Sequence, residues 1–359
     1  MSDVADFLAA LDERSPRVDE LLLDPALMNR VAPVHLREVV RAYLARGGKR
    51  LRPAVLLLAC GAVGGREEDV LPAAAALELF HTWTLIHDDI IDHDDMRRGG
   101  PSGHALGAEL GARDLGLGGA DSLDYGISLA MLAGDVQHGL CVTLFLRTRN
   151  VDPALLAQLV ADLELNVVCD LVEGETLDVQ LEDMPLDEVS LDDVLRMLYL
   201  KTGVLYEFAG KAGAMLGLGT MEESHPRVSA LREFCANCGI AFQLQDDILG
   251  IVGDQQKLGK PVGSDIVEGK RTPVLLKARE AASPADRELL DAVVGNPSAA
   301  PEDVARATEL MVRLGAVDAV AAMARERIDA AYSALGRLPQ SQYTRWLGGW
   351  AQYMIERDF

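Results

Sequence analysis

Two clusters of aspartates lie in segments that are otherwise apolar. Asp88 and Asp92 occur in LIHDDIID, and a second acidic pair, Asp246-Asp247, ends FQLQDD. On a helix, Asp88, Asp92 and Asp95 would share one face, because residues three and four apart are neighbours there. Carboxylates flanked by Leu and Ile are costly to bury without a cation, which argues against a merely solvated acidic face. Mg²⁺ combines one or two carboxylates with substrate phosphates, so both clusters predict a metal–diphosphate site.

Basic residues gather in four segments: GGKRLRP at 47–53, Arg97-Arg98, Lys201-Thr202-Gly203 and the stretch 257–271. Arginine binds phosphate through two N–H groups, and lysine supplies a compact charge. Two groups of cations beside a metal cluster suggest two diphosphates, one bound with metal and one without. The net charge of −22 disfavours nucleic acid as a partner. It does not exclude a small anion, because local charge in a cleft matters more than the total.

Seven motifs follow one another along the chain. They are GGKRLRP (47–53), ELFHTWTLIHDDIIDHDDMRRG (78–99), LAGD (132–135), EGETLD (173–178), KTG (201–203), FQLQDDILG (242–250) and LGKPVGSDIVEGKRTP (258–273). In this order they resemble the polyprenyl synthetase family, the head-to-tail condensing trans-isoprenyl diphosphate synthases, and most of all its short-chain members. The resemblance implies an all-α isoprenoid-synthase-type bundle around a central cavity. It also implies a homodimeric, Mg²⁺-dependent prenyltransferase that joins isopentenyl diphosphate to dimethylallyl, geranyl or farnesyl diphosphate, with three ions bound.

The resemblance carries roles onto the matching residues. The metal ligands would be Asp88, Asp92, Asp246 and, in support, Asp247. The ligands of the allylic diphosphate would be Arg97, Lys201, Lys260 and Lys270. The metal-free isopentenyl diphosphate site would consist of Lys49, Arg52, His81 and Arg98. Thr202 and Gln243 would direct oxygen dipoles at the developing allyl cation, and together with Lys201 they form the expected catalytic group.

The sequence departs from the family pattern at two positions. The second acidic motif usually has a third aspartate, and here Gly250 stands in its place. Asp254 is eight residues beyond Asp246, about 12 Å along a helix, so it is too far to substitute directly. We therefore expect weaker support of one metal and not a loss of activity. Glu175 stands where the family commonly has Gln, and a further acid there could join the water network around the metals or be tolerated.

The residues before the first acidic motif bear on product length. Trp83 precedes Asp88 by five residues, about 7.5 Å down a helix, Thr84 precedes it by four, and Phe80 lies a turn deeper. A large aromatic at this depth would stop a growing chain early. The motif also lacks the two-residue insertion of many bacterial C15 synthases. We expect geranylgeranyl diphosphate as product, with farnesyl diphosphate as the alternative.

Helical signals dominate the elements that must position these residues. The composition, 49% hydrophobic and only 5% aromatic with abundant Ala and Leu, favours helices over a sandwich or barrel. Ser190 with Asp193 and Ser283 with Asp286 have the pattern of helix N-terminal caps. No linker divides the chain, so one all-α domain is expected over 1–359. The glycine-rich stretch 99–126 is expected to be a mobile flap or an inserted loop.

No segment has the length and apolarity of a membrane span, and the N-terminal sequence does not have the pattern of a signal peptide. The five cysteines are therefore expected to be free thiols in the cytoplasm, although Cys235 and Cys238 have the spacing of a redox or zinc pair. Two rival functions stay open. A class I terpene cyclase would not need Lys49, Arg52 and His81. A non-catalytic subunit of a heteromeric synthase would be supported only by Gly250.

Overall fold

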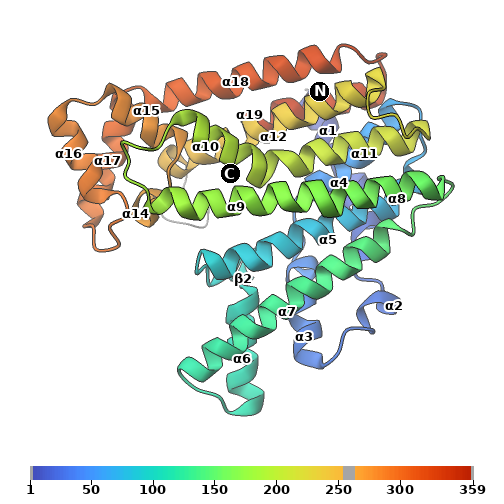
Figure 1. Cartoon of the computed structure of the whole chain (residues 1–359), viewed down its shortest axis with the longest axis horizontal. Helices are drawn as coiled ribbons and strands as arrows, with labels where there is room; N and C mark the ends of the chain where they lie inside the picture. The colour runs from blue at the N-terminus through green and yellow to red at the C-terminus, as the bar shows by residue number, and fades with distance from the viewer. Residues whose placement is uncertain (1–2, 254–262, 357–359) are drawn as a thin grey trace. The chain divides into compact units, whose positions relative to one another are not determined.

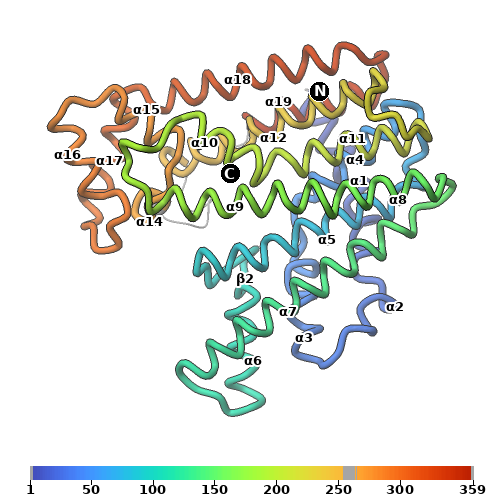
Figure 2. Tube along the Cα trace, in the orientation of Figure 1, coloured from blue at the N-terminus to red at the C-terminus, as the bar shows by residue number. Residues whose placement is uncertain are grey.

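The computed structural model describes residues 3–253 and 263–356 (Figures 1 and 2). Within these ranges nearly every ordered element is a helix. The exception is a small antiparallel hairpin in which β1 (Met96–Arg97) pairs with β2 (Gly100–Pro101). The predicted all-α class is confirmed.

The chain forms two compact units that alternate along the sequence. The amino-terminal unit consists of Leu8–Val160 and Ala212–Glu223. The carboxy-terminal unit consists of Met1–Phe7, Ala161–Lys211 and Ser224–Phe359. The expectation of a single domain over 1–359 stays a prediction.

The amino-terminal unit is built around two long helices. Its helices are most of α1 (Asp3–Leu22), α2 (Pro25–Met28), α3 (Val34–Ala45), α4 (Leu51–Ala62), α5 (Glu67–Ile91), α6 (Gly103–Leu115), α7 (Ala120–Phe145), most of α8 (Pro153–Asp162) and the end of α11 (Val204–Leu218). Helix α5 packs against α4 and α7, and α7 packs in turn against α3 and α6. Because α5 has neighbours on several sides, apolar residues are buried around most of its circumference.

The glycine-rich stretch 99–126 is not a flexible loop, and that prediction was wrong. It contains β2, all of α6 and the start of α7. The hydroxyl of Ser102 caps α6 by accepting from the amide of Ala105. A Cβ on Gly107 would lie 2.8 Å from the Cα of Gly126, so these glycines let α6 and α7 approach closely. The glycine content reflects tight helix packing, which composition alone does not distinguish from flexibility.

Helix α7 is the one described helix with the length and composition of a membrane span, and 39% of its apolar window is buried within the protein. The core helices of soluble proteins have the same features. The prediction that no segment has the length and apolarity of a membrane span is therefore wrong for α7. That the chain does not cross a membrane stays a prediction. Helix α4 is also apolar but is too short to span a bilayer.

The carboxy-terminal unit is organised around α12 (Pro226–Val252). Its other helices are η1 (Leu163–Val167), α9 (Val168–Asp183), α10 (Leu191–Leu198), η2 (Tyr199–Gly203), the start of α11, α14 (Ser264–Glu268), α15 (Pro273–Ala281), α16 (Pro284–Val293), α17 (Pro301–Arg313), α18 (Ala316–Leu335) and α19 (Gln342–Glu356). Helix α12 packs against α18, α19, α15 and the π-helical turn η2. Leu244 and Ile248 of α12 join Val274 and Leu310 in the core.

Local signals predicted several details of this unit correctly. Ser190 and Asp193 form a reciprocal capping box at the start of α10, and Ser283 caps α16. Cys235 and Cys238 are free thiols buried in α12, and burial raises the pKa of both. The spacing of the two cysteines places both side chains in the buried interior of the unit.

Candidate active site

The first acidic motif lies where α5 ends. Asp92 is the C-cap of α5, and its amide donates to the carbonyl of Asp88 at 2.8 Å. One carboxylate oxygen of Asp88 and one of Asp92 lie within 4.8 Å of each other. His93 has a positive φ of 57°, which ends the helix. The prediction that Asp95 shares a helical face with Asp88 and Asp92 is therefore wrong, and the side chain of Asp95 is 82% exposed. The C-terminal end of a helix disfavours negative charge, so the acids gathered here need cations.

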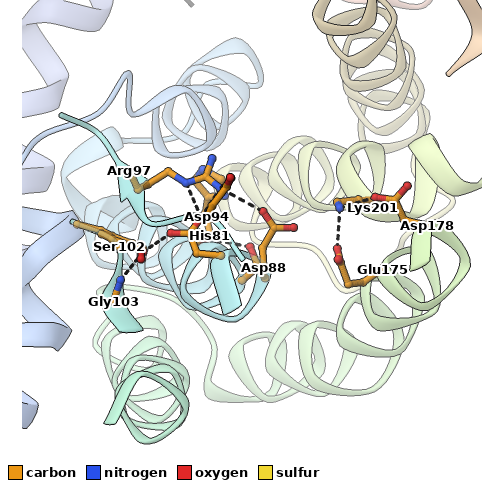
Figure 3. A network of polar contacts seen from close by, with 12 residues as sticks. His81, Asp88, Asp94, Arg97, Ser102, Gly103, Glu175, Asp178 and Lys201 are labelled. Carbon is orange, nitrogen blue, oxygen red and sulfur yellow. Dashed lines mark hydrogen bonds and ion pairs between the residues drawn. The ribbon is translucent and has the colours of Figure 1, made fainter. Parts of the chain in front are cut away.

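One of these cations is supplied by the protein. Asp89 is fully buried, and its carboxylate accepts from Nε of Arg97 at 2.6 Å and also from Nη2. Burial raises the pKa of Asp89, while its hydrogen bonds to Arg97 and Tyr43 lower it. Nη2 of Arg97 also lies 3.4 Å from Asp88 and 3.3 Å from Asp94 (Figure 3). The structure therefore places Arg97 at the first motif, as expected for a ligand of a metal-bound diphosphate.

Tyr43 of α3 is a further hydrogen-bond partner of Asp89. Its buried hydroxyl donates to Asp89 and accepts from the amide of Gly103 at 2.8 Å. Burial and the neighbouring Asp89 raise the pKa of the phenol, so it stays protonated and remains a donor. No local pattern indicates this role, because Tyr43 lies 46 residues before its partner.

The GGKRLRP segment encloses Arg98. Nη1 of Arg98 donates to the carbonyls of Tyr43 at 2.9 Å and Gly47 at 2.6 Å, and Nη2 lies 3.2 Å from Glu78. A Cβ on Gly48, whose φ is +153°, would lie 2.9 Å from the guanidinium carbon of Arg98. A side chain at Gly48 would be strained by this φ and would also displace the guanidinium group of Arg98.

Arg50 is a further member of this group that sequence reasoning missed. Its side chain is 1% exposed and donates to Glu78 at 2.5 Å and to Asp19 at 2.7 Å. A buried carboxylate shared by two guanidinium groups holds the segment in place. Of the two predicted diphosphate ligands beside it, Lys49 is exposed and Arg52 is half-buried. Arg50 stands between these two residues in GGKRLRP, so the motif itself contained the signal.

His81 of α5 lies within this positive environment. Burial lowers the pKa of His81, and the charges of Arg52, Arg98, Arg97 and Arg50 lower it further, in that order. The imidazole is therefore neutral at pH 7 and is surrounded by fixed positive charge. Within the amino-terminal unit, the structure thus brings together His81, Arg52 and Arg98, three of the four residues expected to bind a metal-free diphosphate.

The three predicted chain-length residues lie on α5 before the aspartates. Phe80 is fully buried and packs edge-on against Trp83, with ring centroids 5.0 Å apart. Trp83 stacks on His138 of α7 at 4.5 Å, a contact that the sequence did not indicate. The hydroxyl of Thr84 donates to the carbonyl of His81 at 2.8 Å. Phe80 and His138 also contact each other, with ring centroids 6.2 Å apart, so the three rings form one aromatic cluster that restricts the rotation of Trp83.

In the carboxy-terminal unit, Lys201 lies on the π-helical turn η2. Its ammonium group lies 2.7 Å from Asp178 and 3.0 Å from Glu175, both on α9 (Figure 3). A Cβ on Gly174 would lie 2.4 Å from the amide nitrogen of Lys201, so this glycine allows α9 and η2 to meet. Glu175, noted as a departure, is thus a direct partner of Lys201. Asp178 was part of a recognised motif but had no predicted role.

Thr202 and Gln243 are hydrogen-bonded to each other. The hydroxyl of Thr202 donates to the side-chain oxygen of Gln243 at 3.1 Å, and the amide nitrogen of Gln243 lies 3.4 Å from Asp247. This chain of hydrogen bonds links η2 to the second acidic motif on α12. π-Helical turns often occur at functional sites, which is consistent with the position of KTG at η2.

The second acidic motif contains a carboxylate with an unusual environment. Asp246 is half-buried, whereas Asp247 is only 7% exposed, and Oδ2 of Asp247 has no hydrogen-bond partner among the described residues. Burial raises the pKa of Asp247 well above its ordinary value, and the charges of Asp265 and Asp246 raise it further. Crowded carboxylates with a buried, unsatisfied oxygen fit a hard divalent cation, which would take these oxygens as ligands.

The remaining predicted residues lie in the segment 257–271. Lys260, together with Asp254, lies outside the described residues. Lys270 pairs with Glu268 at 3.6 Å. Arg271 is buried and donates to two carbonyls at the end of α9, so this part of the segment is anchored.

The all-α fold, two acidic groups and a set of arginines beside the first of them are the features expected of an enzyme class that acts on diphosphates. Residues 33–311 match the Polyprenyl synthetase family. The chain belongs to this family, and the prediction of an isoprenyl diphosphate synthase most like the short-chain members is confirmed. The chain is accordingly a prenyltransferase.

Individual relatives agree with this assignment. A "Short chain isoprenyl diphosphate synthase" from Methanothermobacter thermautotrophicus is 35% identical over the whole of both chains. The crystal structure of a geranylgeranyl pyrophosphate synthetase from Pyrococcus horikoshii superposes with a TM-score of 0.84 at 32% identity, covering 98% of this chain and 99% of that one. A geranylgeranyl pyrophosphate synthase from Corynebacterium glutamicum, complexed with isoprenyl diphosphate and magnesium, has a TM-score of 0.83 at 29% identity and covers 98% of each chain.

Proposed function

We propose that this protein condenses isopentenyl diphosphate with dimethylallyl, geranyl or farnesyl diphosphate and releases mainly geranylgeranyl diphosphate. The observation that carries the proposal is the presence of two cationic groups in the amino-terminal unit. Arg97 is bound to the aspartates of the first motif, whereas Arg52 and Arg98 surround the neutral His81. A condensing enzyme needs two such groups for two diphosphates, and a cyclase needs one.

The proposal assigns the metal to the carboxylates. Asp88 and Asp92 would hold Mg²⁺ at the first motif, and Asp246 with Asp247 at the second, with three ions in total. When bound, Mg²⁺ neutralises the charge that develops on a departing diphosphate. Arg97 would add a bidentate contact to the same diphosphate.

The chain's own polar groups would guide the reaction after ionisation. The oxygens of Thr202 and Gln243, held by their mutual hydrogen bond, would face the allyl cation and stabilise its charge without attacking it. Lys201, fixed by Glu175 and Asp178, would contribute positive charge toward the leaving diphosphate. The double bond of isopentenyl diphosphate then forms the new C–C bond, and the departed diphosphate takes up the released proton.

The assay that tests this proposal uses the purified full chain with Mg²⁺, isopentenyl diphosphate and one allylic diphosphate at a time. A dominant C20 product supports it, whereas C15 would favour the farnesyl alternative. Hydrocarbons formed from the allylic diphosphate alone would identify a cyclase. Activity only after addition of a second protein would identify a subunit of a heteromeric enzyme.

Product length provides a second test, because Trp83 is packed in one aromatic cluster with Phe80 and His138. Trp83→Ala removes the largest side chain in this stack, so we expect products longer than those of the wild type. Thr143→Ala, an exposed position on α7, is the matched control and should leave the product profile unchanged. An unchanged profile for Trp83→Ala would contradict the assignment of product length to this residue.

A cytoplasmic homodimer completes the proposal. The five cysteines are all free thiols, which is typical of a reducing compartment. Met131 and Leu132 of α7 and Leu146 at its C-cap are each about half accessible, which is the kind of surface that a second copy would cover. Light scattering of the purified chain would test this, and a monomer at micromolar concentration would contradict it.

A further inference from the structure

An ion-pair network of four residues, Asp19, Arg50, Glu78 and Arg98, connects helix α1 with the cations around His81. Nε of Arg50 donates to Oδ1 of Asp19 on α1 at 2.7 Å, and its Nη1 donates to Oε1 of Glu78 on α5 at 2.5 Å. The same oxygen of Glu78 accepts from Nη2 of Arg98 at 3.2 Å. The charges alternate in sign along the network, and all four residues belong to the amino-terminal unit.

The inner part of this ion-pair network is excluded from solvent. The side chains of Arg50 and Glu78 are 1% and 2% exposed, whereas that of Asp19 is 38% exposed. The third nitrogen of the Arg50 guanidinium, Nη2, donates to the carbonyl of Leu44 at 2.8 Å. Because every nitrogen of this buried group has an acceptor, Arg50 cannot move without leaving a buried charge uncompensated.

Glu78 compensates the charge of Arg98. Among the described residues, it supplies the only carboxylate within ion-pair distance of Arg98. Burial lowers the pKa of Arg98, and the charge of Glu78 opposes this shift. The other hydrogen bonds of Arg98 go to the carbonyls of Tyr43 and Gly47. The position of this guanidinium therefore depends on where Arg50 and Glu78 hold each other.

The ion-pair network also reaches the other cations expected at the metal-free diphosphate site. Arg50 is the N-cap of α4 and stands between Lys49 and Arg52 in the sequence. Its side chain is buried, whereas Lys49 is exposed and Arg52 is half-buried, so an anion can reach these two. His81 follows Glu78 by three residues on α5, and the two side chains therefore share one helical face.

We propose that Asp19, Arg50 and Glu78 are positioning residues of the metal-free diphosphate site, and that helix α1 thereby helps to set the affinity for isopentenyl diphosphate. The inference rests on the proposed function and extends it to three residues that need not touch a substrate. Arg97 does not belong to the ion-pair network, because its ion pairs are with aspartates near the end of α5. The network should therefore act on one substrate and not on the other.

Two substitutions test the two ends of the carboxylate side of the network. Asp19→Asn and Glu78→Gln each keep the size of the side chain and remove its charge. Glu20→Gln, at an exposed position next to Asp19 on α1, is the control for the first. Glu68→Gln replaces an exposed acid on the same helix as Glu78 and is the control for the second.

Binding of isopentenyl diphosphate to the full chain would be measured by calorimetry with EDTA present, so that only a metal-free site is probed. KM values for isopentenyl and geranyl diphosphate would be measured separately with Mg²⁺. We expect Glu78→Gln to weaken binding of isopentenyl diphosphate and to raise its KM about tenfold. Asp19→Asn should have an effect of about threefold, because the exposed end of the network is better solvated.

The KM of geranyl diphosphate and kcat should stay within about twofold of the wild type in both variants, and the controls should behave as the wild type does. Loss of structure alone would lower the melting temperature without distinguishing the two substrates. An equal rise in both KM values would therefore overturn the inference, as would wild-type affinity for isopentenyl diphosphate in Asp19→Asn.

Asp19→Asn decides the question even if Glu78→Gln does not fold, because Asp19 lies at the more exposed end of the ion-pair network. Failure of the proposed function is distinguishable from failure of this inference. It would appear as absence of condensation by the wild type with Mg²⁺, whereas the binding measurement with EDTA does not depend on turnover.

Discussion

The two acidic regions differ in how their buried carboxylate is balanced. In the amino-terminal unit, Asp89 receives two hydrogen bonds from Arg97 and one from Tyr43, so its charge is compensated by the protein. In the carboxy-terminal unit, Asp247 has an amide contact from Gln243 and an unsatisfied oxygen. The first region is stabilised by an ion pair within the protein. In the second, the buried carboxylate of Asp247 is unfavourable unless bound cations compensate its charge.

The largest expected difference between the two regions is in catalytic activity, when one proposed metal ligand of each is replaced. Asp88 is proposed as a direct ligand, so Asp88→Asn should lower kcat/KM roughly a thousandfold. Asp247→Asn removes only a supporting carboxylate and should cost about 10- to 100-fold, mainly as a higher Mg²⁺ requirement. Steady-state kinetics over a range of Mg²⁺ concentrations would measure both.

Asp95→Asn serves as the control for this comparison, because Asp95 lies beyond the end of α5 and is exposed. It should retain activity within about twofold of the wild type. A loss at Asp95 comparable to that at Asp88 would show that the motif acts as three ligands on one face, contrary to the observed end of the helix.

Replacing the buried aspartate by asparagine should change the free energy of unfolding differently in the two regions. Asp89→Asn leaves Arg97 without its buried partner charge and should lower the free energy of unfolding by about 3 kcal/mol. Asp247→Asn removes a poorly compensated buried charge and should leave the stability unchanged or raise it. Thermal melting in the absence of divalent cations would compare them, and equal losses for both variants would contradict the contrast drawn here.

Short-range sequence patterns predicted much of this site. The residues that they missed are held by contacts between positions far apart in the sequence. The spacing of Asp88 and Asp92 and the caps at Ser190 and Ser283 follow from neighbours within one helical turn. The hydrogen bond between Thr202 and Gln243 joins two recognised motifs 41 residues apart and was not predicted. Partners distant in sequence gave no local signal, and they include Tyr43, His138 and Asp178. The glycines of 99–126 were misread because close packing of α6 on α7 and flexibility require the same residue type.

The pH dependence of stability should distinguish the regions further. The folded-state pKa of Asp247 is raised, so the folded chain holds this proton at pH values where the unfolded chain has released it. Its stabilising contribution is full below the unfolded pKa of about 3.9 and is lost as pH rises through the folded pKa. Asp247→Asn should therefore reduce the fall in melting temperature with rising pH in metal-free protein. Added Mg²⁺ should reduce the same fall in melting temperature in the wild type. An identical pH profile for Asp247→Asn and the wild type would show that Asp247 does not cause the pH dependence.

His81 should show the opposite dependence, with the smallest effect of the series. Burial and the surrounding arginines depress its folded-state pKa, so below an unfolded pKa of about 6.5 the unfolded chain binds a proton that the folded chain does not. The free energy of unfolding should therefore decrease as pH falls below about 6.5, by at most about 1.4 kcal/mol per pH unit. His81→Gln should flatten this slope. Inorganic diphosphate should flatten it in the wild type, because its negative charge offsets Arg52 and Arg98 and raises the pKa of His81. If His81→Gln melts with the wild-type slope between pH 7 and pH 5, the arginines do not act on this imidazole.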